Sequence, residues 1–123
     1  MLVLDAFSGD APPAHLLTRE AFGTYLAHLR QPGGIIAVNI STNALDLQPV
    51  VQGLADYFRL LSVLVAVPAP QDGIGLASRW VLLSRDVTFM RDPAIVSAAS
   101  AARSTRQVAL WTDERHSLFP LLR

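Results

Sequence analysis

Two carboxylates flank a short loop near the start of the sequence. Asp5 follows the apolar run 1–4, and Asp10 closes the loop that contains Ser8. Carboxylates placed in this way could hold an ammonium group and accept its proton as the amine becomes a nucleophile. A purely structural interpretation also stands, in which Asp5 ends a strand and Asp10 caps a turn, because aspartate is common in turns.

Other side chains could also take part in chemistry, but the sequence around them gives less support for a functional role. His15 could act as an acid or a base, although a histidine without an identified partner is more often structural. Ser8 is not in the Gly-x-Ser-x-Gly setting that exposes a hydroxyl nucleophile, which argues against a hydrolase. Gly73 and Gly75 form only half of a dinucleotide-binding fingerprint, so a loop is the better interpretation. The sequence has no cysteine and no metal-ligand spacing, so we expect no metal site.

The composition fits one folded domain. The chain has 123 residues, of which 51% are hydrophobic, and this is enough for a single modest core. Its 10 basic residues, all arginine, balance 10 acidic residues, so no global field attracts nucleic acid or an anionic membrane. The apolar run 60–67 is shorter than a membrane span, and the start lacks the basic opening of a signal peptide. We therefore expect a soluble cytoplasmic protein.

The pattern of apolar residues predicts the strands that would position the candidate side chains. Continuous apolar runs, typical of strands in a parallel sheet, occur at 1–4, 35–40 and 60–67. A further strand is expected at 79–84, and it should pair antiparallel with the strand before it, because no helix separates the two. Polar residues gather where the run 35–40 ends, which is the usual place for a ligand-facing loop in an α/β sheet.

Helical patterns alternate with these strands. The spacing predicts a helix over 18–30 with Thr18 as its cap, and a second over 47–58 behind Asp46. Asp92 and Pro93 mark the start of an alanine-rich helix that should run to about residue 103. The resulting order, β-α-β-α-β-β-α, predicts the α/β class with a mainly parallel sheet and one antiparallel strand.

Several stretches of the sequence carry a family resemblance. These are residues 2–22 (LVLDAFSGDAPPAHLLTREAF), 29–37 (LRQPGGIIA), 111–114 (WTDE) and 117–122 (SLFPLL). Together they resemble the spermidine synthase family, and more closely the bacterial spermidine synthase-like proteins. In that family a strand ends in an aspartate, a gate loop with a second aspartate follows, and Pro-Gly-Gly precedes the next strand.

The resemblance implies a fold, an activity and a set of site residues. The fold would be the C-terminal half of a Rossmann-like methyltransferase fold. The activity would be aminopropyl transfer from decarboxylated S-adenosylmethionine to a diamine. Asp5 would be the catalytic carboxylate and Asp10 its gate-loop partner, while the substrate-binding positions would be Ser8, His15 and Asn39. Asn39 stands where many synthases of the family carry a glutamine.

The resemblance also implies that part of the family domain is missing. The first three strands of the family, with the glycine-rich loop that approaches the nucleoside, would precede residue 1. Residues 1–123 are therefore expected to form a single partial domain that binds no cofactor by itself and is inactive alone. Because the run 1–4 would then form an apolar sheet edge, we expect a homo-oligomer or a complementary N-terminal half as partner. The alternative function is a non-catalytic remnant or self-associating assembly module.

Overall fold

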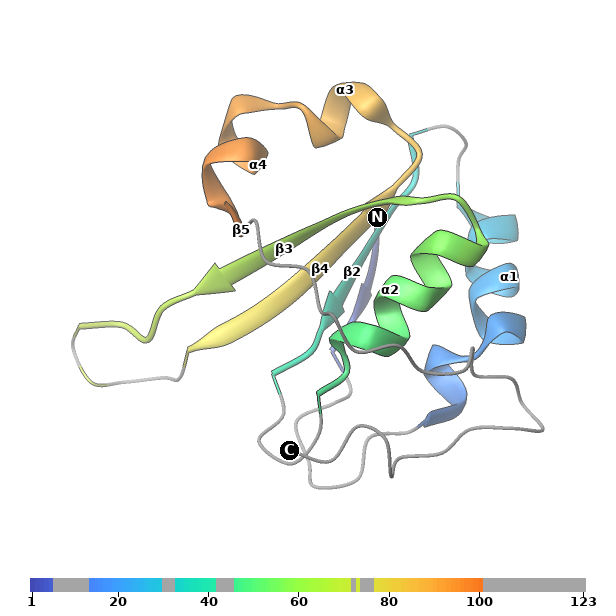
Figure 1. Ribbon diagram of the computed structural model, residues 1–123, viewed down its shortest axis with the longest axis horizontal. Helices are drawn as coiled ribbons and strands as arrows, with labels where there is room; N and C mark the ends of the chain where they lie inside the picture. Colours follow the sequence, from blue (N-terminus) through green and yellow to red (C-terminus); the bar gives the residue numbers. More distant parts are fainter. Residues whose placement is uncertain (6–13, 30–32, 42–45, 72, 74–76, 101–123) are drawn as a thin grey trace.

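The fold is an α/β arrangement around one mixed sheet (Figure 1). The computed structural model describes residues 1–5, 14–29, 33–41, 46–71, 73 and 77–100. The strands are β1 (Leu2–Leu4), β2 (Ile35–Asn39), β3 (Leu61–Val67), β4 (Ser78–Ser84) and β5 (Ala99–Ser100). The helices are the 3-10 turn η1 (Ala14–Leu17), α1 (Arg19–His28), α2 (Gln48–Tyr57), α3 (Val87–Met90) and α4 (Pro93–Ala98).

The sheet has the strand order β1-β2-β4-β3-β5. The predicted antiparallel pairing of the third and fourth strands is confirmed, because β3 pairs with β4 over its whole length. The predicted α/β class is confirmed with a mixed sheet: β1, β2 and β3 run in the same direction, although within the described residues only β1 and β2 are paired in parallel. The reason is the position of β4, which lies between β2 and β3 and runs opposite to both.

One face of the sheet forms the core with η1, α1 and α2. Alternate residues of each strand point to this face, as the pleat requires. The strand side chains of the core cluster are Leu4, Ile36, Val38, Leu64, Val81 and Leu83. The main helical contributors are Leu17, Phe22, Val50, Val51 and Leu54. Figure 1 shows α1 and α2 on the same side of the sheet, which explains why a single cluster joins all of these residues.

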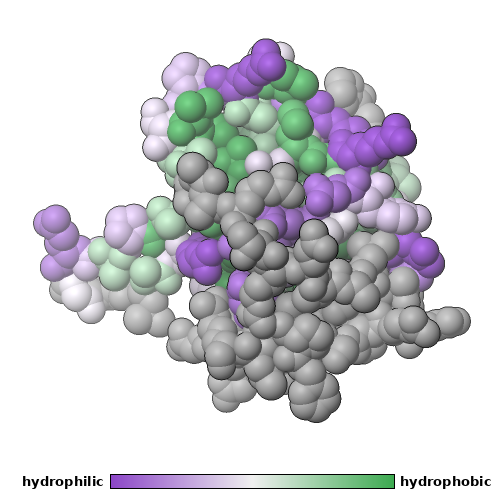
Figure 2. Space-filling view, viewed as in Figure 1, coloured by the Kyte–Doolittle hydropathy of each residue, from purple (hydrophilic) through white to green (hydrophobic). Residues whose placement is uncertain are grey.

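The helices α3 and α4 lie on the other side of the sheet, beside β3 and β4 (Figure 1). Their packing is looser than that of α1 and α2, because α4 buries no residue and Met90 is the buried residue of α3. Figure 2 shows hydrophobic side chains gathered on the surface over this part of the molecule. Val87 and Val96, 46% and 59% exposed, belong to these helices.

The predicted capping residue is confirmed at the start of α1 but not at the start of α2. Thr18 caps α1 as predicted, since its hydroxyl accepts a hydrogen bond from the Ala21 N–H at 3.2 Å. For α2 the predicted cap is displaced by one position. The N-cap residue is Leu47, whose side chain makes no cap, and Asp46 just before it accepts from the Gln48 N–H at 3.3 Å.

The end of α2 is a Schellman motif with an arginine in the position that usually holds glycine. The Leu60 N–H donates to the Ala55 carbonyl at 2.7 Å, and the Arg59 N–H donates to the Asp56 carbonyl at 3.3 Å. Arg59 has a φ of 56°, in the left-handed region. The turn leads directly into β3 and buries Leu60.

The last helix is shorter than predicted. Asp92 caps α4, accepting from the Ala94 N–H at 2.9 Å, but the helix ends at Ala98 instead of near residue 103. Ala99 is extended and pairs antiparallel with Val65 of β3. Since α4 buries no side chain, packing does not favour further helical turns, whereas the edge of β3 supplies backbone partners. Residues 101–123 lie outside the described residues.

Candidate functional site

The candidate site lies at the carboxyl ends of β1 and β2. Asp5 is the first residue after β1, and Asn39 is the last residue of β2. The parallel register pairs Leu4 with Val38, so the next residues of the two strands become neighbours. The Asn39 Nδ2 donates a hydrogen bond of 2.6 Å to the Asp5 Oδ1. The structure therefore brings together two residues that the sequence analysis selected as catalytic and substrate-binding.

The amide of Asn39 is fixed at both ends. The Ser41 N–H donates to the Asn39 Oδ1 at 2.9 Å, which leaves the amide nitrogen facing Asp5. Ser41 is itself held by β4, because its hydroxyl accepts from the Arg79 N–H at 2.6 Å. The Ile40 N–H adds a hydrogen bond of 2.9 Å to the Arg79 carbonyl. The orientation of the Asp5 carboxylate therefore depends on a chain of contacts that reaches the centre of the sheet.

Sequence reasoning missed the role of Arg79. Arg79 is partly buried, and its Nη2 donates to the Gln48 Oε1 at 3.2 Å. Gln48 is 6% exposed at the start of α2. A signal was present, because Arg79 directly precedes the apolar run of β4, where a charged side chain needs a partner.

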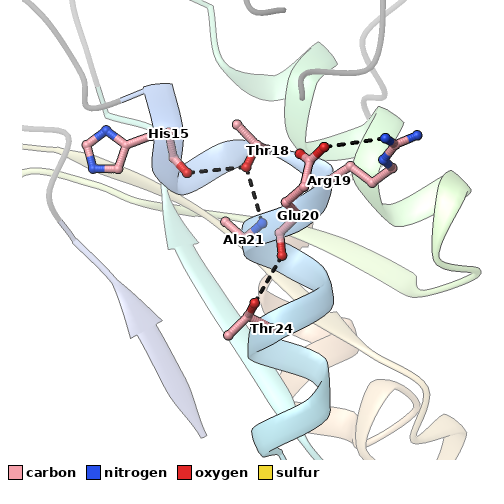
Figure 3. A network of polar contacts seen from close by, with 6 residues as sticks. All are labelled: His15, Thr18, Arg19, Glu20, Ala21 and Thr24. Carbon is pink, nitrogen blue, oxygen red and sulfur yellow. Dashed lines mark hydrogen bonds and ion pairs between the residues drawn. The ribbon is translucent and has the colours of Figure 1, made fainter. Parts of the chain in front are cut away.

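The other predicted site residues do not join this pair in the described structure. Asp10 and Ser8 lie outside the described residues. His15 is exposed on η1, and in the described ranges no hydrogen bond links it to Asp5 or Asn39. Figure 3 shows its ring pointing away from the other labelled side chains, while its carbonyl accepts from the Thr18 hydroxyl at 3.3 Å.

His15 instead lines an open hollow at the start of α1. The hollow has a volume of about 310 Å³ and is lined by His15, Glu20, Ala21 and Thr24. Its polar contacts are those of a helix start (Figure 3): the Thr24 hydroxyl donates to the Glu20 carbonyl at 3.2 Å. Arg19 forms an ion pair with the Glu20 carboxylate at 3.3 Å, with both side chains substantially exposed. These contacts stabilise local helix structure, so the hollow is a weaker candidate than the Asp5 and Asn39 pair.

Metal binding has no structural basis in the described residues. Among them, no group of at least three histidine, cysteine, aspartate or glutamate side chains could hold a metal ion. The chemistry that the site offers is therefore that of one carboxylate and one oriented amide: an ion pair or hydrogen bonds to a positively charged donor.

Comparisons with known proteins give one partial match. No protein-family model matches the chain. A stretch of 62 residues is 37% identical to the major facilitator superfamily multidrug transporter mfsC of Aspergillus fumigatus. The match covers 48% of this chain and 12% of the transporter, so the chain spans only a small part of that relative. Over the described residues, we find no helix with the length and hydrophobicity that crossing a membrane requires.

These comparisons correct the expected relationship to the spermidine synthase family. The matching curated protein is a transporter, and no family model supports a synthase. The expected aminopropyl transfer, and with it a place in polyamine biosynthesis, is therefore wrong. The resemblance failed because a strand that ends in aspartate, a turn and a Pro-Gly-Gly stop are local features that many α/β chains share. The expected co-substrate, decarboxylated S-adenosylmethionine, stays a prediction without structural support, as does the cytoplasmic location.

Proposed function

We propose that this chain binds small molecules that carry a protonated amine, at the carboxyl ends of β1 and β2. The observation that carries the proposal is the 2.6 Å hydrogen bond from Asn39 Nδ2 to Asp5 Oδ1 at the ends of two neighbouring parallel strands. Ligands of α/β sheets bind outside the carboxyl ends of parallel strands, where loops leave room for them. Asp5 is exposed there and can meet such a ligand.

The charge arrangement supports a cationic ligand. In the part of the chain that the structure describes, no arginine forms an ion pair with Asp5. The partly buried Arg79 is directed to Gln48 instead. An exposed carboxylate alone binds a cation weakly, but a carboxylate whose orientation is already fixed loses less entropy when it binds.

The finer assignment of the fold belongs to the same proposal. The sheet corresponds to the C-terminal half of a Rossmann-like methyltransferase fold, with β1, β2 and β3 in one direction and a reversed strand between the last two. The support is the strand order β1-β2-β4-β3 with its antiparallel β4. A fold of this kind hosts many functions, so it adds nothing to the choice of ligand.

A titration followed by nuclear magnetic resonance tests the proposed site. The probe is n-butylammonium, with 1-butanol as the neutral control of similar shape. We expect the ammonium probe alone to shift the Asn39 side-chain amide and the Ser41 backbone amide. Asp5→Asn should weaken binding about tenfold or more, because a hydrogen bond to a charged group contributes about 1.5–3 kcal/mol. Asn39→Ala should weaken it less, since the carboxylate stays but loses its orientation.

Glu20→Gln is the matched control for this titration. It removes a carboxylate that lines the hollow beside His15 and leaves the sheet ends unchanged. Loss of binding in Glu20→Gln together with normal binding in Asp5→Asn would place the ligand in the hollow and reject the proposal. Equal shifts with butanol and butylammonium would also reject it, because the charge would then play no part.

A further inference from the structure

We infer that Trp80 determines the specificity of the amine site at Asp5 and Asn39, a conclusion that rests on the proposed function. Its indole ring favours ammonium ions whose nitrogen carries methyl groups over primary ammonium ions. Three features of the structure lead to this assignment: the position of Trp80 in the sheet, the direction of its ring and the spacing of the strands.

The register of the sheet places Trp80 beside Asn39. The two residues are directly opposite each other in the antiparallel pair of β2 and β4. At the next position along, the Ile40 N–H donates to the Arg79 carbonyl at 2.9 Å. Because hydrogen-bonded and non-hydrogen-bonded pairs alternate, Asn39 and Trp80 form a non-hydrogen-bonded pair, in which side chains are closer together. The Cβ atoms of opposed residues are about 4.5–5.5 Å apart.

The carboxylate, the amide and the indole form a row on one face of the sheet. The core cluster contains a sequence neighbour of each of these residues, namely Leu4, Val38 and Val81. Since successive residues of a strand point to opposite faces, Asp5, Asn39 and Trp80 share the face away from that cluster. The row crosses from the end of β1 through β2 to β4. The hydrogen bond from Asn39 to Asp5 agrees with this arrangement.

The indole ring is directed to the end of the sheet at which the amine site lies. Its Nε1–H donates to the Ser78 Oγ at 3.2 Å, and Ser78 is the first residue of β4. Because β4 is antiparallel to β2, the start of β4 lies at the end of β2 (Figure 1). The same hydrogen bond satisfies the polar group of the indole. A ligand therefore contacts the aromatic ring itself, whose negative face attracts cations.

The spacing of the row suits one methylated ammonium ion. Neighbouring strands are about 4.7–4.9 Å apart, so two such spacings separate Asp5 from Trp80. A nitrogen above Asn39 is then about one strand spacing from each, within the roughly 6 Å over which an aromatic face attracts a cation. Asp5 is exposed, and Asn39 and Trp80 are partly exposed. Methyl groups on the nitrogen fill this interval and contact the ring, whereas a primary ammonium binds close to the carboxylate through its N–H groups.

A titration with matched probes tests this preference. Choline is the methylated probe, 3,3-dimethyl-1-butanol replaces its charged nitrogen with carbon, and n-butylammonium is the primary amine. The nuclear magnetic resonance reporters are the Trp80 indole N–H, identified by its absence in Trp80→Phe, and the Asn39 side-chain amide. We expect choline to shift both signals and to bind more tightly than butylammonium. The neutral alcohol should bind more weakly than choline.

Substitutions of the ring test whether Trp80 causes the preference. Trp80→Leu should weaken choline binding about tenfold, because the cation loses its contact with the aromatic face, and should change butylammonium binding much less. Trp80→Phe keeps a ring and should have an intermediate affinity for choline, which carries the test if circular dichroism shows that Trp80→Leu does not fold. Tyr57→Leu is the matched control. It removes an exposed ring at the end of α2, over which the Arg19 guanidinium lies at 5.9 Å.

The outcomes distinguish this preference from the proposed function. Butylammonium binding that Asp5→Asn weakens, with no preference of the native chain for choline, would overturn the role of Trp80 and leave the proposed function standing. Loss of choline binding in Tyr57→Leu but not in Trp80→Leu would overturn it too, because another ring would then hold the cation. Equal binding of choline and the neutral alcohol would also overturn it. If neither ammonium probe binds, or if Asp5→Asn leaves their binding unchanged, the proposed function itself is rejected, and the preference with it.

Discussion

At the scale of single residues, Asn39 gives the candidate site its order. It is 34 residues from Asp5 in sequence, and the two meet only because β1 and β2 are parallel neighbours. Its amide donates to Asp5 and accepts from Ser41, so one side chain links the ends of two strands. Replacing it changes the direction of the carboxylate without changing the charge. Asn39 is thus a positioning residue, and Asp5 is the group expected to contact the ligand.

Tyr25 makes stability depend on pH in the alkaline range. Burial raises the pKa of its phenol above the ordinary value of 10.0, and its hydroxyl donates to the Leu16 carbonyl at 3.0 Å. A raised pKa means that the folded state holds this proton more tightly than the unfolded state. The contribution is complete below pH 10.0, the ordinary value, and is lost as the pH rises above it.

Tyr25→Phe tests this dependence. We expect the variant to be about 1 kcal/mol less stable than the native chain at neutral pH, from the lost hydrogen bond. The difference should shrink above pH 10 as the native phenol ionises, because the native chain then loses the same contribution. Urea unfolding at a series of pH values measures both quantities. Tyr57→Phe, which removes an exposed hydroxyl, is the control, and a native-to-variant difference that stays constant with pH would contradict the assignment.

The two residues at the candidate site could be predicted from the sequence, but the residues that hold them in place could not. Asp5 and Asn39 could be selected because polar residues directly after apolar runs face the loops of an α/β sheet. Arg79 and Ser41 could not be joined in this way, because their contacts depend on β4 lying next to β2. No local pattern specifies that a strand inserts between two earlier ones. Contacts between residues far apart in sequence, such as those that hold Ser41, are therefore the part of the site that could not be predicted.

At the scale of elements, the turn that ends α2 carries backbone strain. Arg59 occupies the left-handed position of the Schellman motif with a φ of 56°. For a residue with a Cβ atom, this conformation costs about 1–2 kcal/mol relative to the right-handed helix. Glycine adopts it without that penalty, although its unfolded state has more entropy to lose.

Arg59→Gly should therefore stabilise the protein by up to about 1 kcal/mol, the strain relieved less the entropy of glycine. Thermal and urea unfolding measure the change. Arg59→Ala is the matched control, because it removes the guanidinium and keeps the Cβ atom. Equal stabilisation by alanine and glycine would attribute the effect to the lost charge, not to the backbone.

The elements themselves were largely predictable, and the failures have physical causes. Helices α1 and α2 follow from apolar periodicity, since each buries one face in the core. The four-residue α3 is too short to give any periodic signal. Helix α4 was predicted too long because alanine favours a helix locally, whereas Ala99 pairs with β3 instead. Tertiary pairing decided the outcome where local preference was weak.

At the scale of the whole molecule, the two faces of the sheet differ in how much buried side-chain packing on each contributes to stability. The main core cluster lies between the sheet and the helices α1 and α2. Leu83 and Leu82 are adjacent in β4 and point to opposite faces. Leu83 is 1% exposed in the main cluster, while Leu82 is only partly buried. The pair therefore compares the two faces within one strand.

Leu83→Ala should lower the free energy of unfolding by about 2–5 kcal/mol, from the lost burial and the cavity left behind. Leu82→Ala should cost clearly less, because that side chain is already partly in water. Urea unfolding measures both changes in the free energy of unfolding, provided that its dependence on urea concentration is the same in the two variants and the native chain. Equal losses would show that the second face is as tightly packed as the first.

The insertion of β4 also determines the order in which the sheet can form. β2 and β3 are separate in the sheet until β4 lies between them, so neither can complete its pairing from earlier parts of the chain. Among the described residues up to the end of β3, the sheet that can form during synthesis is the short β1 and β2 pair. Pairing of β3 with β4 is the local step of folding. Pairing of β4 with β2 is the long-range step, and such steps are slow because distant segments of the chain must meet. We expect the nascent protein to acquire its core only after residue 84 has emerged, in a single late step.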